Sequence, residues 1–265
     1  MNNHEIDYKL YGDDMQYVEV ELDPNETVIA EAGSLMMMDD GIKMETIFGD
    51  GSSKSGGGFM NKLMGAGKRL ITGESLFMTT FTNTGMGKRH VYFASPYPGK
   101  IIPMDLSELN GKIICQKDAF LAAAKGVSVG VEFQRKIAAG FFGGEGFIMQ
   151  KLEGDGMAFV HAGGAIHKKE LQPGEVLRVD TGCFVAMTSD VEYNIEAVGG
   201  VKTALFGGEG IFFATLRGPG TVWIQSLPFS RLASRVFAAA PVSKGGGGKD
   251  VGEGGIGGLF NLFND

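Results

Sequence analysis

The stretch VSVGVEFQRKIAAGFFGGEGF at residues 127–147 occurs again, in altered form, as VEYNIEAVGGVKTALFGGEGI at residues 191–211. A constant offset of 64 residues superposes the two GGEG turns at their ends. The same offset superposes Phe120 on Phe184, upstream of both stretches. Several features that share one order and one spacing indicate an internal duplication rather than chance similarity.

A third copy lies nearer the N-terminus. Residues 22–28, LDPNETV, match residues 171–177, LQPGEVL, at an offset of 149 residues, which also superposes Leu35 on Phe184. This copy is longer before its own glycine–glutamate turn. Its glycine- and serine-rich stretch at residues 49–58 has the composition of an inserted flexible loop.

Apolar and polar residues alternate in each copy, as in VEVEL at 18–22, EVLRVD at 175–180 and TVWIQS at 221–226. This period of two is typical of strands with one buried face, so each copy is predicted to be a β-sandwich. We therefore expect an all-β chain of three sandwich units in a pseudo-threefold arrangement. The units are expected at residues 1–85, 86–155 and 156–240, with a glycine-rich tail at 241–265.

One short helix is predicted near the C-terminus, over residues 228–239. Pro228 suits the first turn of this helix, and Ser226 is a candidate cap. Residues 117–125, KDAFLAAAK, also have helical propensity. Their alignment with the DTGCFVAMT stretch of the next copy instead predicts a turn followed by a strand.

The composition narrows the class of protein. A formal net charge of -7 disfavours broad contact with the phosphates of nucleic acid. Cys115 and Cys183 lie in apolar stretches, which is typical of free thiols in a reducing compartment. The first ten residues have no apolar signal segment, and no window approaches the length of a membrane span. We expect a cytoplasmic protein.

Three stretches resemble a known family: AEAGSLM at 30–36, GESLF at 73–77, and Gln225-Ser226 before the predicted helix. They resemble the mitochondrial-biogenesis "altered inheritance of mitochondria" family, formerly domain of unknown function 124. The resemblance implies a fold like that of the tryptophan RNA-binding attenuation protein, whose relatives assemble into rings. Three domains in one chain then imply a homotrimer. The family has no assigned catalytic residues, and its mitochondrial location is not expected here because the sequence shows no transit peptide.

Glu74, Glu145 and Glu209 end equivalent glycine–glutamate turns. Three carboxylates related by internal symmetry would suit Ca²⁺ or Mg²⁺ if they converged. Alternatively, the glycines supply positive φ angles and the glutamates accept backbone N–H bonds. The turns lack the spaced Asp and Asn residues of a calcium loop, which favours the structural role.

His161 and His167 flank a Gly-Gly turn in HAGGAIH. Across a hairpin, the two imidazoles would come close enough to share a metal ion. No carboxylate lies between them and the other copies lack both, so ordinary strand histidines are the favoured interpretation. His90 falls near His161 in the repeat, which indicates a strand position shared by two copies.

Residues 59–70, FMNKLMGAGKRL, combine apolar and basic side chains that suit an anionic membrane surface or the groove of a partner protein. The alternative is a plain connector, because QRKIAAGFF fills the same place in the second copy. The candidate contact residues are Phe59, Met60, Lys62, Leu63, Met64, Lys68 and Arg69.

The sequence assigns no reaction. It contains no nucleophile elbow and no phosphate-binding loop, and we expect no cofactor and no nucleic-acid partner. A non-enzymatic, oligomeric β scaffold or binding protein is the main prediction. A small-molecule sensor with clefts between the repeats is one alternative, and a cryptic metal-binding protein or metalloenzyme is another. Docking of the apolar GLFNLF segment at 258–263 stays open.

Overall fold

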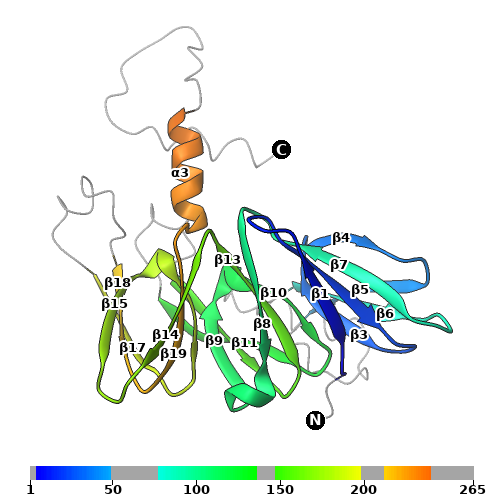
Figure 1. Ribbon diagram of the computed structural model, residues 1–265, viewed down its shortest axis with the longest axis horizontal. Helices are drawn as coiled ribbons and strands as arrows, with labels where there is room; N and C mark the ends of the chain where they lie inside the picture. Colours follow the sequence, from blue (N-terminus) through cyan, green and yellow to red (C-terminus); the bar gives the residue numbers. More distant parts are fainter. Residues whose placement is uncertain (1–3, 49–76, 136–146, 198–211, 240–265) are drawn as a thin grey trace, which may run out of the picture. The chain divides into compact units, whose positions relative to one another are not determined.

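The computed structural model describes residues 4–48, 77–135, 147–197 and 212–239 (Figure 1). The chain forms two compact units, Met1–Leu232 and Ala233–Asp265. We call the first unit the β body, because it contains every strand that the structure describes. The boundaries expected at 85/86 and 155/156 inside the β body stay predictions.

The described strands form four antiparallel sheets, numbered here 1 to 4 and given in the order of hydrogen-bonded neighbours. Sheet 1 contains β1 (Asp7–Tyr11), β2 (Tyr17–Leu22), β7 (Arg89–Ala94) and β4 (Leu35–Met38). Sheet 2 contains β5 (Ile42–Phe48), β6 (Phe77–Asn83), β3 (Thr27–Glu31), β10 (Phe120–Ala124), β13 (Met157–Gly163) and β8 (Gly99–Asp105). Sheet 3 contains β11 (Ser128–Arg135), β12 (Phe147–Glu153), β9 (Lys112–Gln116), β16 (Phe184–Thr188), β19 (Gly220–Gln225) and β14 (Ile166–Leu171). Sheet 4 contains β15 (Val176–Asp180), β18 (Phe212–Arg217) and β17 (Glu192–Ala197).

One pairing pattern occurs three times along the chain. In repeat 1, which runs from β2 to β7, β7 pairs with β2 and β4, while β6 pairs with β3 and β5. Repeat 2 (β8 to β13) and repeat 3 (β14 to β19) pair their six strands in the same way. Consecutive repeats join edge to edge, β3 with β10 and β9 with β16. Each six-stranded sheet is therefore half from one repeat and half from the next.

A register shift marks the same place in all three repeats. It follows Leu35 in the β4–β7 pair, Phe120 in the β10–β13 pair and Phe184 in the β16–β19 pair. Each shift leaves one extra residue on the first strand, as in a β-bulge. The residues that carry it are those superposed by the sequence offsets, so the internal triplication and the all-β prediction are confirmed.

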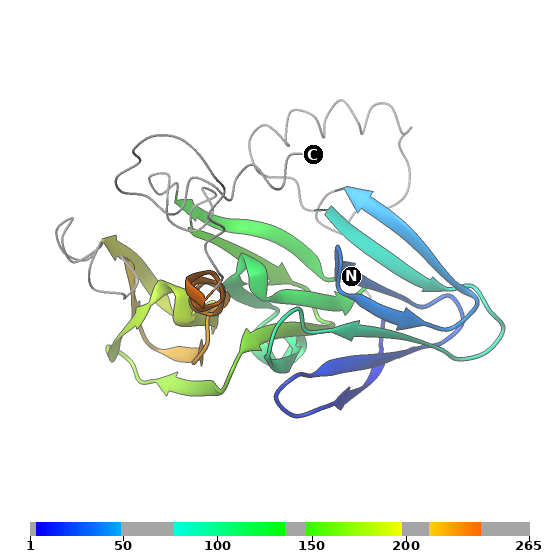
Figure 2. The same cartoon turned by 90° about the horizontal axis from the view of Figure 1, so that it is seen from above.

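Three apolar cores lie between successive sheets, as the alternating strand patterns predict. Val18 and Val91 of sheet 1 pack with Phe81 of sheet 2, and Val179 of sheet 4 packs with Phe184 of sheet 3. The middle core joins sheets 2 and 3 and includes Ile29, Val160, Ile113 and Trp223. In both views of the β body, sheets 1 and 4 lie at opposite ends of this stack (Figures 1 and 2).

Two turns show how the Pro-x-Glu sequences work. Asn25 and Gly174 take positive φ angles of 70° and 78°, which Asn and Gly adopt most easily. The following carboxylates close the turns: Glu26 accepts from the Asp23 N–H at 2.8 Å, and Glu175 accepts from the Gln172 N–H at 3.0 Å. These glutamates have the structural role that we also considered for the glycine–glutamate turns.

The helix predicted at 228–239 is present as α3 (Phe229–Ala239). Ser226 does not cap it, because the Ser226 hydroxyl accepts from the Ala165 N–H, while the Pro228 carbonyl accepts from the Arg231 N–H. Residues 117–125 form the 3₁₀ turn η2 (Lys117–Ala119) and then β10, as the alignment predicts. Across the described ranges, no helix has the length and apolar character needed to cross a membrane.

Candidate functional site

Strand β4 is an apolar edge strand that no described strand covers. It pairs with β7 on one side, and its residues Met36, Met37 and Met38 are 49%, 46% and 40% exposed. The residues of β10 and β16 at the same positions of the repeat are all buried, because β3 and β9 pair with those strands. The exposure of β4 is therefore that of a strand with one neighbour, β7, among the described strands. We call residues 35–38 the β4 edge.

Strand β15 is the matching open edge at the other end of the stack. Its described neighbour is β18 alone. Val176 and Arg178 are exposed, whereas the equivalent residues of β3 are buried. Long uncovered edges are templates for pairing with another chain. We call residues 176–180 the β15 edge.

The outer face of sheet 1, opposite its core, carries a row of aromatic rings. The rings of Tyr11 and Tyr17 stack at 5.0 Å between centroids, and Tyr92 lies 6.4 Å from Tyr17. By register, Tyr92 is the counterpart of Phe159 and Trp223. Those two side chains are buried between sheets, whereas Tyr92 stays partly exposed. The row is thus a second apolar surface that its counterparts in repeats 2 and 3 bury.

A charged group borders this row. His90 Nδ1 lies 3.1 Å from an Asp39 carboxylate oxygen, and His90 Nε2 lies 3.3 Å from a Glu21 oxygen. The His90 backbone N–H also donates to Asp39 at 2.7 Å and is the main cause that lowers the pKa of Asp39. Lys88 donates to Glu21 and lowers the pKa of that carboxyl. These contacts hold the ends of β2, β4 and β7 together.

A cavity of about 750 Å³ lies between repeats 1 and 2. Asp105 on its wall accepts from both the backbone and the hydroxyl of Ser107. His4 lines the other side; it accepts from the Thr27 N–H at 2.9 Å, and burial lowers its pKa. The carboxyl residues on the lining are Glu5, Glu26, Asp105 and Asp155. Among the described residues no lysine or arginine lines it, so the charge of this lining favours a cationic occupant.

The hairpin that the metal-binding alternative for His161 and His167 required does not form. His161 lies in β13 of sheet 2, opposite Ile101, whereas His167 lies in β14 of sheet 3, opposite Ile224. The Gly-Gly turn between them therefore crosses from one sheet to the next. His90 is likewise not the counterpart of His161, because register places Ala94 at that position.

His161 is instead part of a buried group that the sequence reasoning missed. Its ring meets the Tyr97 ring edge-on at 4.4 Å between centroids, and neither ring nitrogen has a hydrogen-bond partner among the described residues. Burial lowers the pKa of His161 to about 4 and raises that of Tyr97 to about 12. The imidazole is therefore neutral at pH 7. Only the position of Tyr97 in a loop just before β8 could have drawn attention to it.

The remaining predicted site residues lie outside the described residues. These are the turn glutamates Glu74, Glu145 and Glu209, and the contact candidates at 59–70. Within the ranges that the structure does describe, no three His, Cys, Asp or Glu side chains are grouped so as to hold a metal ion.

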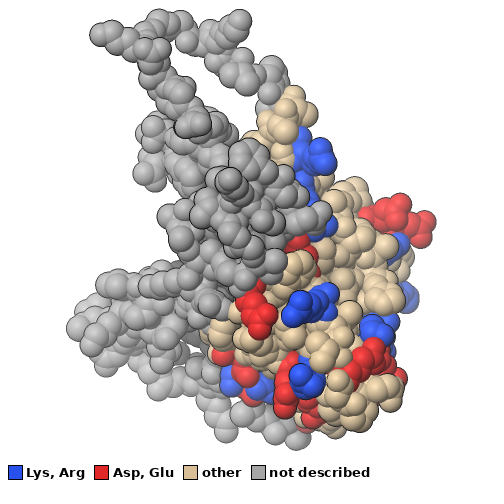
Figure 3. All heavy atoms as spheres, turned by 90° about the vertical axis from the view of Figure 1, so that its left-hand side faces the viewer, with Lys and Arg blue, Asp and Glu red and all other residues tan. Residues whose placement is uncertain are grey.

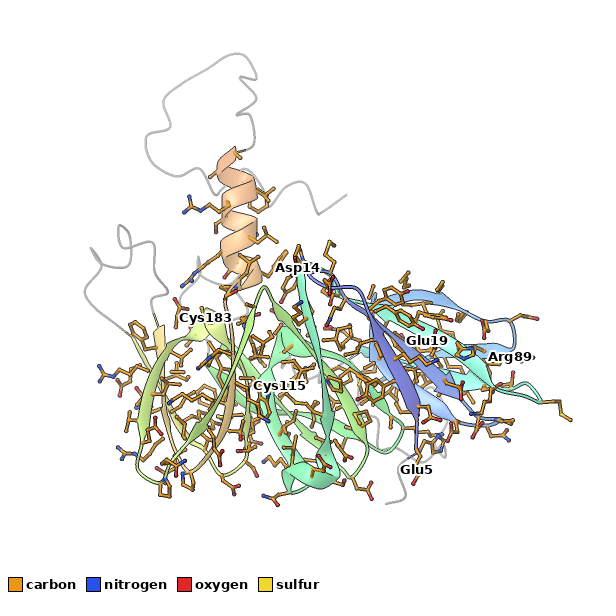
Figure 4. The ribbon with its side chains drawn as sticks, in the orientation of Figure 1. Glu5, Asp14, Glu19, Arg89, Cys115 and Cys183 are labelled. Atoms are coloured by element: carbon orange, nitrogen blue, oxygen red, sulfur yellow. The ribbon has the colours of Figure 1, made fainter. Side chains whose placement is uncertain are left out.

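The two thiols lie well apart (Figure 4). Cys115 is buried in β9 within the middle core, and burial raises its pKa to about 12, so this thiol is unreactive at neutral pH. Cys183 lies in the 3₁₀ turn η4 (Thr181–Cys183) and is partly exposed. On the face seen in Figure 3, acidic and basic side chains are interspersed rather than gathered by sign.

Residues 8–227 match the family described as mitochondrial biogenesis AIM24. An uncharacterized protein of Streptococcus pyogenes serotype M6 is 30% identical over 230 residues, which cover 85% of this chain and 87% of that protein. The crystal structure of a Streptococcus pyogenes protein has a TM-score of 0.70 at 25% identity and covers 89% of this chain and 100% of that one. The chain therefore belongs to the mitochondrial biogenesis AIM24 family.

Proposed function

We propose that this protein is a non-enzymatic, oligomeric β scaffold that binds a partner, and that its chains assemble as a homotrimer. The exposed β4 edge is the observation that carries the proposal, because the same strand is buried in the two later repeats. The ring assemblies implied by the family resemblance support the trimer. A cytoplasmic location and contact with a partner or a membrane surface through residues 59–70 belong to the same proposal.

Light scattering on the purified full chain tests the assembly. We expect a particle of about three times the 28.1 kDa of one chain. Met37→Lys places a charge on the β4 edge, where pairing would desolvate it, and should shift the particle to the mass of one chain. Met86→Lys is the matched control, because Met86 is 99% exposed in the turn before β7. This variant should keep the mass of the wild type.

A monomeric wild-type protein at micromolar concentration would contradict the trimer. So would a Met37→Lys particle of unchanged mass, because the β4 edge would then have no part in assembly. Circular dichroism of both lysine variants should match the wild type, which separates lost assembly from lost folding.

The cavity between repeats 1 and 2 supports a second candidate, a sensor of a small cationic ligand. Its volume of about 750 Å³ is in the range of ligand pockets, and four carboxyl residues line it. Spermidine should raise the melting temperature of the wild type by several degrees. Asp105→Asn together with Asp155→Asn should reduce that shift, whereas Asp14→Asn, at a carboxylate outside the lining, should not. An equal shift in all three proteins would reflect net charge alone.

A further inference from the structure

Two strand pairs inside the chain, β3 with β10 and β9 with β16, show how one repeat pairs with the next. We call each such pair of edge strands a joint. In the first joint Ala122 of β10 lies opposite Ala30 of β3, and in the second Ala186 of β16 lies opposite Cys115 of β9. Ala122 and Ala186 both stand two residues after the phenylalanine that precedes the register shift. The two joints therefore have the same antiparallel register.

The open strands can be aligned with these joints residue by residue. Leu35 precedes the shift in repeat 1, so Met37 takes the place of Ala122 and Ala186. On the other strand, Ala30 is the fourth residue after the turn carboxylate Glu26, and Val179 is the fourth after Glu175. Val179 therefore takes the place of Ala30, and both point into the core of their own repeat.

We propose that the β15 edge of one chain pairs antiparallel with the β4 edge of a second copy, with Met37 opposite Val179 of the partner subunit. This inference rests on the proposed oligomeric scaffold and names its joint. Sheet 4 of one copy and sheet 1 of the next then form one continuous sheet. Apart from β1, it takes three strands from each repeat, as sheets 2 and 3 do.

The side chains on the two edges complement each other in this register. Met38 lies opposite Arg178 of the partner subunit, and Asp40 follows two residues later, in the turn after β4, where the long Arg178 side chain can reach it. Arg178 replaces the buried Ile29 of the first joint, so the open edge carries a charge that keeps it soluble while uncovered. When the two edges pair, the Asp40 carboxylate can then form an ion pair with Arg178 of the partner subunit.

The aromatic row on sheet 1 supports the same arrangement. Tyr92 is the counterpart of Phe159 and Trp223, which the preceding sheet in the stack covers. In the proposed joint, the sheet that precedes sheet 1 is sheet 3 of the partner subunit. A head-to-tail joint of this kind uses two different surfaces, so it leaves one of each free until the assembly closes.

Disulfide trapping tests the register. In a Cys183→Ser background, Met37→Cys combined with Val179→Cys should link subunits in air. Directly opposite Cα atoms in antiparallel strands are about 4.5–5.5 Å apart, within the range that a disulfide spans. Cys115 stays in place because it is fully buried. Denaturing electrophoresis without reductant should show linked dimers and trimers, with at least five times more linked chain than in the control pair below.

The control pair is Met37→Cys with Leu177→Cys, because Leu177 is two residues away from Val179 on the same strand. Diagonal neighbours are about 7–8 Å apart, too far for a disulfide. A trimer by light scattering in which the Val179 pair does not link, or in which the Leu177 pair links equally, overturns the register but not the scaffold. Linking by Met37→Cys alone overturns it in favour of a symmetric β4–β4 joint. A monomer overturns both proposals.

Two other occupants of the β4 edge would give different results in these experiments. A disulfide within one chain, seen at the mass of one chain, would mean that the two edges of a single copy meet. A variant that ends at residue 240 removes the apolar GLFNLF segment. A full chain that is monomeric and a truncated chain that is trimeric would assign the β4 edge to that segment, and this result also overturns the joint in the intact protein.

Discussion

Glu31 ends strand β3, in the position that Gln116 and Asp180 occupy in the later repeats. Asp180 has a cationic partner, because its carboxylate lies 2.9 Å from the guanidinium of Arg231. Glu31 lies close to Asp118 instead. Burial and the nearby Asp118 charge raise the pKa of Glu31 to about 7, and Lys117 offsets only part of this effect. Glu31 is therefore a carboxyl whose charged form the fold disfavours.

This shift predicts a pH dependence of stability. Between pH 4.5 and about 7 the folded state keeps a proton that the unfolded chain has lost, so the free energy of unfolding falls as the pH rises. Glu31→Gln removes the unfavourable free energy of ionising this buried carboxyl in the folded state. The variant should gain roughly 2 kcal/mol over the wild type at pH 8 and little at pH 4.5, measured by urea unfolding.

Asp14→Asn is the control for Glu31→Gln, because the Asp14 side chain is 96% exposed. It should change the free energy of unfolding by the same small amount at both pH values. A Glu31→Gln variant with an equal effect at pH 4.5 and pH 8 would show that the carboxyl is ionised normally in the folded protein.

At the scale of single elements, the sequence predicts the strands but not which strands pair. Period-two alternation identifies the buried face of a strand, and it correctly indicated β2, β15 and β19. The same alternation does not say which strand lies alongside. The Gly163-Gly164 turn illustrates the limit, because a short glycine turn serves equally for a hairpin and for a crossing between sheets. The metal-binding alternative for His161 and His167 depended on a hairpin, whereas both residues lie in strands, as the favoured interpretation had it.

The β4 edge could not be recognised from sequence for a related reason. Its LMMM run is as apolar as FLAAA in β10 and FVAMT in β16, which are buried. The composition of the three runs therefore does not distinguish the exposed strand from the two buried ones. What differs is the neighbour: β10 and β16 receive a strand from the preceding repeat, whereas β4 opens the series. The alignment of the repeats could be predicted from the sequence. That β4 has a single neighbour among the described strands is seen only in the strand pairing of the structure.

At the scale of the whole molecule, a series of three repeats has two unlike ends. Repeat 1 ends in the β4 edge and repeat 3 ends in the β15 edge, and each matches the strand that the other lacks. Identical copies joined by unlike ends form either a closed ring or an open fibre. A closed ring covers both the β4 edge and the β15 edge, which removes the hazard of further pairing at these two strands.

Because the two ends differ, mixing two variants can distinguish head-to-tail pairing of β15 with β4 from symmetric pairing of β4 with β4. Met37→Lys blocks the β4 edge and leaves the β15 edge intact. Arg178→Glu does the reverse, because it places a carboxylate next to Asp40 of the partner subunit. Each variant alone should be a monomer. Mixed in equal amounts they have one usable joint between them, so light scattering should give about twice the 28.1 kDa of one chain and no trimer.

The masses of the separate variants discriminate between the two geometries. If β4 paired with β4 of a second copy, Arg178→Glu would stay assembled and the mixture would gain nothing. If the joint is head-to-tail, the mixed dimer must contain one chain of each kind, because only the Met37→Lys chain offers a working β15 edge and only the Arg178→Glu chain offers a working β4 edge. A tagged Met37→Lys chain should therefore retain the untagged Arg178→Glu chain in equal amount, and should not retain an untagged copy of itself.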